Sequence, residues 1–118
     1  MPQFRIAIHG DARIRYLDSG GDDRGAPVVF VPGFTCVAED YIAVLPLFGR
    51  RAVVVELRGH GRSVAPGGPY DATARAGDIG AVIDDVTAGP VHLMTFSRGT
   101  SYALTWALAH PDRVRSIS

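Results

Sequence analysis

Apolar residues along this chain fall into short runs that predict a series of strands. Over residues 4–18 they alternate with polar or small residues around a turn at 9–11, which predicts an amino-terminal β-hairpin. Three later runs, at 28–31, 52–57 and 91–96, are almost continuously apolar, and each is followed by a glycine-containing turn. Such runs are typical of parallel strands that are buried on both faces of a sheet.

Helical spacing appears between and after these strands. Over residues 72–88 the apolar side chains recur at intervals of four and three, and Asp71 stands where an N-cap is expected. A second helix with one apolar face is predicted over 98–110. The full set of expected elements comprises strands near 4–8, 13–18, 28–31, 52–57, 91–96 and 114–118, and helices near 38–47, 72–88 and 98–110.

Strands that alternate with helices predict the α/β class. The expected architecture is a three-layer sandwich, with helices on both faces of a mostly parallel sheet and right-handed crossovers. The chain has 118 residues, of which 47% are hydrophobic. This is enough for one globular core and too little for two domains, so a single domain over 1–118 is expected.

Charge and cysteine content exclude some classes of function. The 12 basic and 12 acidic side chains cancel, so no excess charge favours nucleic acid or an anionic membrane as a partner. Cys36 is the only cysteine and cannot form an internal disulfide. No secretory signal pattern or run of membrane-spanning length is present in the sequence, which favours a cytoplasmic location with no membrane partner.

One serine stands where the sequence predicts an abrupt change from strand to helix. Ser97 lies between the run at 91–96 and the helix at 98–110, with Thr95 two residues before it and Gly99 two residues after it. Backbone geometry on so sharp a turn is strained, and small neighbours avoid a collision across it. The turn frees the hydroxyl from the sheet, so the sequence predicts Ser97 as a nucleophile.

Two backbone amides are predicted to face an oxyanion formed beside this serine. The N–H of Arg98 lies at a helix N-terminus, where the unpaired N–H groups attract negative charge. The second donor would come from the loop after the first buried strand, where Phe34 follows Gly33. The N–H groups of Phe34 and Arg98 are therefore the predicted oxyanion hole, each contributing about 3 kcal/mol.

At this point the sequence resembles the α/β-hydrolase fold family. Four segments carry the resemblance in the same order: the strand and turn at 28–33, the loop at 58–63, the turn around Ser97, and the segment at 109–114. The resemblance implies a serine hydrolase that acts without a cofactor on an ester or related acyl bond. It also implies that a serine in this position, in place of an aspartate, disfavours dehalogenase and epoxide hydrolase chemistry.

The chain departs from the family pattern at two positions. Thr95 stands where glycine is usual, and its β-branch makes the turn tighter. Pro32 stands where many members have histidine. This change is tolerable because the predicted oxyanion donor is a backbone N–H, that of Phe34, and not the side chain at position 32.

The resemblance places the other triad residues later in the chain. In this family the serine is followed by the acid and then by the histidine. We therefore expect residues 1–118 to form a truncated hydrolase domain that is nearly inactive alone, since loss of a triad costs on the order of a millionfold in turnover. His60 is the candidate surrogate base, although a Gly-His-Gly turn is more simply a structural loop whose imidazole bonds to the backbone.

The remaining polar residues favour structural roles. His9, His92 and His110 are predicted to be structural, whereas Asp78, Asp84 and Asp85 are expected on the solvated side of a helix. No His, Cys and carboxylate pattern has the spacing of a metal site, so neither metal nor cofactor is expected.

A second hypothesis is a non-catalytic binding or interaction module built on a truncated hydrolase fold. The expected partner of the first hypothesis is a small acyl substrate of unspecified identity. Under either hypothesis the last strand would form an exposed sheet edge, through which the chain could self-associate.

Overall fold

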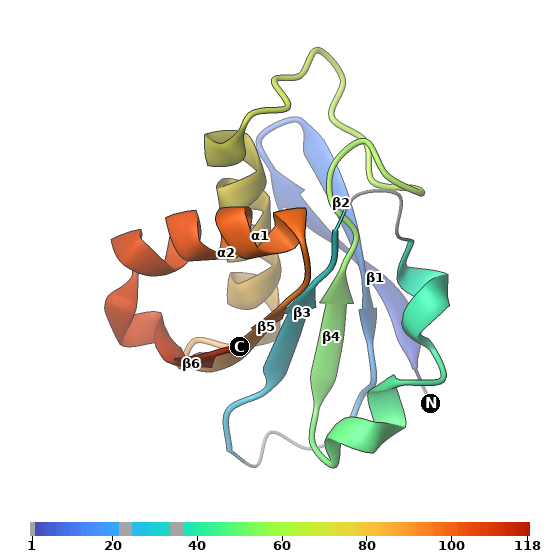
Figure 1. The fold of residues 1–118 in the computed structure, drawn as a ribbon. Coiled ribbons are helices and arrows are strands. Elements are labelled where there is room, and N and C mark those ends of the chain that lie inside the picture. Colours follow the sequence, from blue (N-terminus) through green and yellow to red (C-terminus); the bar gives the residue numbers. More distant parts are fainter. Residues whose placement is uncertain (1, 22–24, 34–36) are drawn as a thin grey trace.

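The computed structural model, which describes residues 2–21, 25–33 and 37–118, is built on a six-stranded sheet with strand order β1-β2-β4-β3-β5-β6 (Figure 1). The strands are β1 Gln3–His9, β2 Ala12–Asp18, β3 Val28–Val31, β4 Ala52–Val55, β5 Val91–Thr95 and β6 Val114–Ile117. The β1–β2 and β2–β4 pairs are antiparallel, whereas β3 pairs in parallel with β4 and β5, and β5 with β6. This confirms the α/β class, with a mostly parallel sheet and an amino-terminal hairpin.

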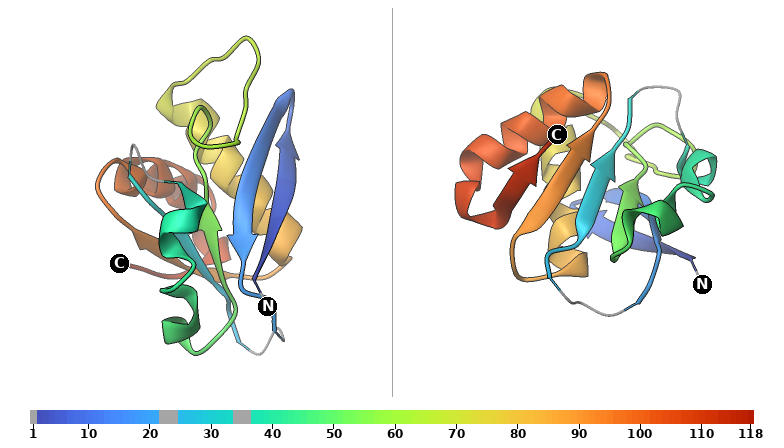
Figure 2. Two further views of the ribbon diagram at one scale, coloured as in Figure 1. Left: turned by 90° about the vertical axis from the view of Figure 1, so that its right-hand side faces the viewer. Right: turned by 60° about the horizontal axis from the view of Figure 1, so that its bottom comes forward.

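Helices cover the two faces of the sheet differently. The α-helices α1 (Ala72–Val86) and α2 (Arg98–Ala109) lie together on one face, while the short 3-10 helices η1 (Ala38–Tyr41) and η2 (Leu45–Phe48) lie on the other (Figure 2). A third short helix, η3 (Pro111–Arg113), leads into β6. Within the described ranges, no helix has the length and apolarity needed to cross a bilayer.

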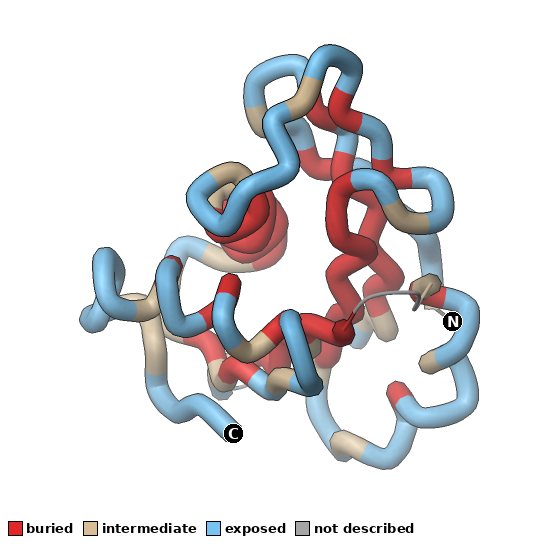
Figure 3. The backbone as a smooth tube through the Cα atoms, turned by 45° about the horizontal axis from the view of Figure 1, so that its top comes forward, coloured by how far each residue is buried: buried red, intermediate tan, exposed pale blue. Residues whose placement is uncertain are grey.

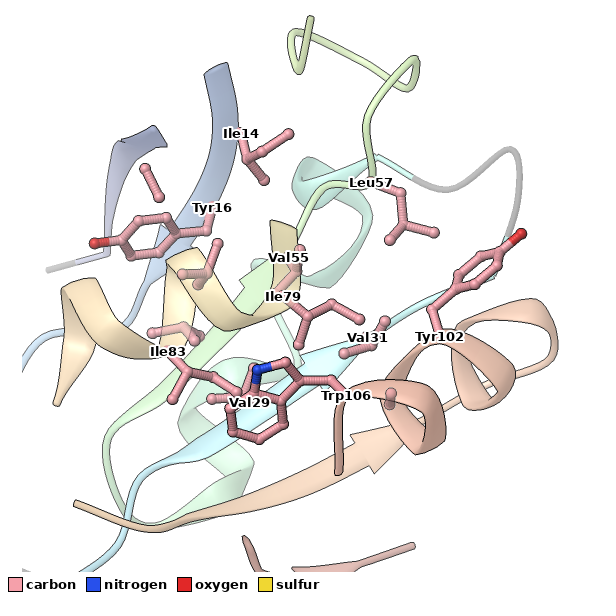
Figure 4. Close-up of a cluster of buried hydrophobic side chains, with 14 of the residues drawn as sticks. Ile14, Tyr16, Val29, Val31, Val55, Leu57, Ile79, Ile83, Tyr102 and Trp106 are labelled. Atoms are coloured by element: carbon pink, nitrogen blue, oxygen red, sulfur yellow. The ribbon is translucent and has the colours of Figure 1, made fainter. Parts of the chain in front are cut away.

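The alternation of side chains along β4 divides the core into two clusters. Val53 and Val55 face the larger cluster beneath α1 and α2, whereas Ala52 and Val54 belong to the smaller one beneath η1 and η2. Buried positions accordingly concentrate in the central strands β2, β3 and β4 and on the inner sides of the helices (Figure 3). In the larger cluster, the Trp106 indole of α2 lies close to residues of β3 and α1 (Figure 4).

The segment 38–47 does not form the single helix that the sequence predicted. It contains the separate turns η1 and η2, which are joined through residues 42–44. Pro46 has no backbone N–H, and its ring would collide with the carbonyl group four residues earlier in a continuous α-helix. Pro46 instead stands in the first turn of η2, where the missing N–H costs little.

Two glycines inside α1 allow its neighbours to approach closely. A Cβ atom on Gly77 would lie 2.2 Å from Cε1 of His9, and one on Gly80 would lie 2.5 Å from Nε1 of Trp106. These glycines lower helix propensity by about 1 kcal/mol each, but they let the hairpin and α2 pack directly against the α1 backbone. At the start of α1, the Asp71 carboxylate accepts a hydrogen bond of 2.9 Å from the Ala74 amide, as the predicted N-cap requires.

Asp78 is not on the solvated side of its helix, so that prediction is wrong. Its side chain is fully buried and accepts hydrogen bonds from Nε and Nη2 of Arg58 at 2.6 and 2.7 Å. Nδ1 of His9 lies 2.8 Å from the same carboxylate. The guanidinium group and the imidazole replace the water that an isolated buried carboxylate would lose. Asp84 and Asp85 on the same helix are exposed, as expected.

Candidate active site

Ser97 lies in strained backbone geometry at the junction of β5 and α2. Its φ and ψ are 56° and −125°, and among the described residues it is the only non-glycine with a positive φ. A residue with a Cβ adopts this region only when surrounding structure compensates for about 1–3 kcal/mol of strain. The side chain is exposed to solvent. The junction therefore presents a hydroxyl at the carboxyl end of the sheet, with the backbone held beneath it.

Gly99 leaves room for β3 beneath this turn. A Cβ atom at Gly99 would lie 2.3 Å from the carbonyl oxygen of Val31 and 2.4 Å from that of Pro32. No side chain can occupy that space unless the backbone shifts, since real Cβ atoms do not approach oxygen so closely. The small residue two positions after the serine is thus required by the packing of α2 on the end of β3.

Thr95, on the other side of the serine, is accommodated by hydrogen bonds at the edge of the turn. Its hydroxyl donates to the carbonyl oxygen of Ser118 at 2.9 Å and accepts from the hydroxyl of Thr100 at 3.0 Å. The β-branched side chain therefore links α2 to the end of the neighbouring β6 segment. This explains how the chain tolerates threonine where the resemblance predicts glycine.

The loop after β3 lies directly against the serine. A Cβ atom on Gly33 would be 3.0 Å from Cβ and 3.5 Å from Oγ of Ser97. The contact brings the chain leading to the predicted oxyanion donor beside the nucleophile. Phe34 itself lies outside the described residues, as does Cys36, so its role as the second donor stays a prediction.

The amino end of α2 contributes to the electrostatic environment of Ser97. Arg98 is the first residue of this 12-residue helix, directly after Ser97. The amides of Gly99 and Thr100 are already paired, with the carbonyls of Phe96 and Ser97 respectively, each at 3.1 Å. The partial positive charge of a helix N-terminus favours an anion next to this end. The arrangement can stabilise negative charge that develops beside the Ser97 hydroxyl.

His60 lies in a tight turn after β4. Its Nδ1 is 3.3 Å from the carbonyl oxygen of Arg58, and its backbone N–H donates to Leu57 at 3.0 Å. The imidazole therefore bonds to the backbone, as expected of a structural loop. His92 and His110 also bond within the fold, with the Ser116 hydroxyl at 2.6 Å and the Trp106 carbonyl at 3.0 Å.

Sequence interpretation missed Glu56, a carboxylate immediately after β4. Its side chain is fully buried between Arg15 and the loop of residues 59–63. Burial alone would raise the pKa of Glu56, but hydrogen bonds from the Arg15 side chain and from the Ala38 and Arg62 amides outweigh burial and hold this pKa below its ordinary value. The signal in the sequence was an acidic residue enclosed by Val55 and Leu57 at the end of an apolar run.

Metal ligands do not gather near this site. Over the described ranges, no group of three or more His, Cys, Asp or Glu side chains could hold a metal ion.

Comparison with known proteins gives a consistent result. Residues 26–118 match the sequence profile described as "alpha/beta hydrolase fold". A non-heme chloroperoxidase of Streptomyces lividans is 35% identical over 113 residues, which cover 92% of this chain and 41% of that protein. The structure of Epoxide Hydrolase A from Mycobacterium thermoresistibile superposes with a TM-score of 0.86 and 27% identity, over 99% of this chain and 38% of that one.

A third similar protein is Est816, described as an N-acyl homoserine lactone degrading enzyme. Its structure superposes with a TM-score of 0.84 and 27% identity, covering 96% of this chain and 43% of that one. This chain thus spans about two fifths of the length of each of these proteins.

Proposed function

This chain belongs to the alpha/beta hydrolase fold family, and from that membership we propose that it carries the nucleophile of a serine hydrolase acting on an ester or related acyl bond. The observation that supports the proposal most is the strained, positive-φ backbone of Ser97 at the strand-to-helix junction. Strain of this kind persists where the surrounding structure fixes it, and it is common at catalytic residues. The close packing of Gly33 and Gly99 around the junction provides that constraint.

The proposed reaction begins with attack of the Ser97 oxygen on the acyl carbon. As the C–O bond forms, the hydroxyl proton passes to a histidine base, which delivers it to the departing alcohol. The oxyanion formed in between accepts hydrogen bonds from the N–H groups of Arg98 and Phe34. Water then attacks the acyl-enzyme, releases the acid and restores the serine.

We assign the histidine base and its acid to sequence outside residues 1–118. The order of the triad in this fold is serine, acid and histidine, so both partners follow the nucleophile. His60 is the alternative base within this chain, but its Nδ1 lies 3.3 Å from the Arg58 carbonyl, which is the geometry of a loop-stabilising contact.

An acyl substrate is proposed because of the residue at the junction. Relatives named for chloroperoxidase and epoxide hydrolase activity show that the fold supports several chemistries. A serine hydroxyl attacks a carbonyl carbon and gives an acyl ester that water can cleave. Est816, a protein of similar structure, is described as an N-acyl homoserine lactone degrading enzyme, and a lactone is a cyclic ester.

Covalent labelling tests this proposal. Full-length protein containing these residues is treated with a fluorophosphonate probe, and the modified peptide is mapped by mass spectrometry. We expect a single adduct at Ser97, no adduct in Ser97→Ala, and unchanged labelling in Ser101→Ala, which removes an exposed hydroxyl one turn later in α2.

The same probe applied to residues 1–118 alone locates the base. We expect labelling slower by several orders of magnitude, because the serine lacks its general base. Rapid labelling that His60→Gln abolishes would instead place the base in this chain. A folded full-length protein that leaves Ser97 unmodified would contradict the proposal and support the binding-module hypothesis.

A further inference from the structure

A groove of about 640 Å³ lies between β1 and the helices α1 and α2. Its lining comprises residues 6–9 of β1, small and acidic residues of α1 between Gly77 and Asp85, and Trp106 and His110 of α2. Neither Ser97 nor Gly33, which lies against it, belongs to this lining. The groove is therefore separate from the candidate active site.

The β1 wall of the groove is an open edge of the sheet. Among the described strands, β1 pairs only with β2. Arg13, which lies opposite Ile8, exchanges both of its backbone hydrogen bonds with the loop after β4, at 2.8 and 2.9 Å. Arg15, opposite Ile6, directs its N–H and its carbonyl group to that loop and to the end of β4, at 2.8 and 3.0 Å. Opposed residues of an antiparallel pair exchange both bonds or neither, so Ile6 and Ile8 direct their N–H and C=O groups away from β2, to the open edge.

Trp106 brings a hydrogen-bond donor to the opposite wall. Its side chain is 4% exposed, and its ring stacks on His110 with centroids 4.7 Å apart. Nε1 is directed towards α1, where a Cβ atom on Gly80 would lie 2.5 Å from it (Figure 4). No hydrogen bond joins this N–H to another described residue, and the atom keeps contact with solvent through the groove. A buried indole N–H ordinarily has an acceptor, which a ligand in the groove would supply.

One end of the groove carries excess negative charge. Asp84 is 68% exposed and pairs with Arg113 at 2.9 Å. Asp85 is also exposed and accepts a hydrogen bond from the Tyr16 hydroxyl. Arg113 is the only cation of the described residues that pairs with either carboxylate, so a further positive group at this end would be attracted.

The walls of the groove match the length of a short extended segment. Along α1, the seven residue steps from Gly77 to Asp84 rise by about 10 Å. Along β1, the three steps from Ile6 to His9 also span about 10 Å. His9 lies beside Gly77, which places Ile6 towards the acidic end. A segment of three or four residues in the extended conformation therefore has the length of the groove.

We propose that this groove binds an extended peptide segment of a partner protein, which adds to β1 as a further strand and carries a lysine or arginine at the acidic end. The N–H and C=O groups of Ile6 and Ile8 pair with the peptide backbone, and the Trp106 N–H donates to a carbonyl group of the peptide. In strand addition, backbone hydrogen bonds give affinity and side-chain complementarity gives specificity. A single strand fits between β1 and the two helices, whereas a second copy would bring helices of its own. The inference does not depend on the proposed hydrolase function.

Peptide binding to the full-length protein tests this inference. The probe is a fluorescein-labelled hexapeptide that alternates lysine and valine, and binding is followed by fluorescence anisotropy. We expect saturable binding that weakens as salt is added, since exposed charges are screened. The same peptide with N-methyl groups on alternate backbone nitrogens keeps its side chains but cannot pair on both edges, and it should bind about tenfold more weakly. A peptide with glutamate in place of lysine should also bind more weakly.

Two substitutions at one position locate the bound peptide. Ile6→Pro removes the N–H at the open edge and leaves the bonds between β1 and β2, a position at which strands tolerate proline. Ile6→Thr is its matched control, because it shortens the apolar side chain but keeps the N–H. We expect Ile6→Pro to weaken binding about tenfold relative to Ile6→Thr. Asp84→Asn combined with Asp85→Asn should weaken binding several-fold and reduce its salt dependence.

Hydrogen–deuterium exchange over residues 4–9, measured by mass spectrometry, should slow when the hexapeptide is added. Absence of binding, equal affinity for the N-methylated peptide, or equal affinity of folded Ile6→Pro and Ile6→Thr would overturn the proposal. If Ile6→Pro does not fold, the N-methylated peptide still decides the question on the unaltered protein. Residues 4–9 that are already protected without peptide would also overturn it. Protection at every protein concentration would then assign the groove to a segment of the same chain, and protection that grows with concentration would assign it to a second copy.

Discussion

At the scale of single residues, the site depends on an absence of side-chain atoms near the serine. We predict that Gly99→Ala destabilises the fold by about 1–3 kcal/mol, the usual range for overpacking. The reason is that its Cβ would lie 2.3 Å from the Val31 carbonyl oxygen, in a place that only a backbone shift can open. Urea unfolding followed by circular dichroism measures the change in the free energy of unfolding.

Gly89→Ala is the matched control for this prediction. A Cβ atom there would have the Thr87 hydroxyl at 3.8 Å, which is ordinary van der Waals contact. We expect its free energy of unfolding to change by about 0.5 kcal/mol or less. If both variants unfold at the same urea concentration, close packing of α2 on β3 does not constrain the serine turn.

At the scale of elements, the sequence predicted those features that depend on residues close to one another along the chain. The apolar runs that became β3 and β5, the cap at Asp71 and the position of Ser97 between strand and helix all depend on near neighbours in the sequence. The burial of Glu56 and Asp78 depends instead on partners that are far away in the sequence. Glu56 meets Arg15 across 41 positions, and Asp78 meets His9 across 69, so no window of helical or strand periodicity contains the partner.

The pairing of Asp78 gives a prediction about how α1 docks. Asp78→Ala leaves the Arg58 guanidinium buried without its carboxylate, and we expect a loss of about 3–5 kcal/mol in the free energy of unfolding. Asp84→Ala, on the same helix, removes an exposed carboxylate that pairs with Arg113. Because this pair is exposed, its loss should lower the free energy of unfolding by only about 0.2–1 kcal/mol. Similar midpoints for the two variants in thermal or urea unfolding would contradict the buried role of Asp78.

At the scale of the whole molecule, the sheet has an open edge through which two chains could pair. The described strands end in β6 at one edge of the sheet, where Val114–Ile117 pairs with β5 on one side only. An edge strand with unpaired N–H and C=O groups is a template for another strand. Ile117 is 40% exposed on this edge, so its apolar side chain adds to the tendency to associate.

We therefore predict that residues 1–118, prepared as a separate chain, self-associate through β6. Ile117→Lys should shift the mass measured by sedimentation towards that of a monomer, because a charge on an edge strand opposes edge-to-edge pairing. Leu108→Lys is the control: it also replaces an exposed apolar side chain with a charge, but on α2, at a residue that is 82% exposed. If Leu108→Lys reduces association as much as Ile117→Lys, apolar surface in general drives it. If the unmodified chain is a monomer at every concentration, the β6 edge is sufficiently protected by its own geometry, and the full-length protein does not need to cover it.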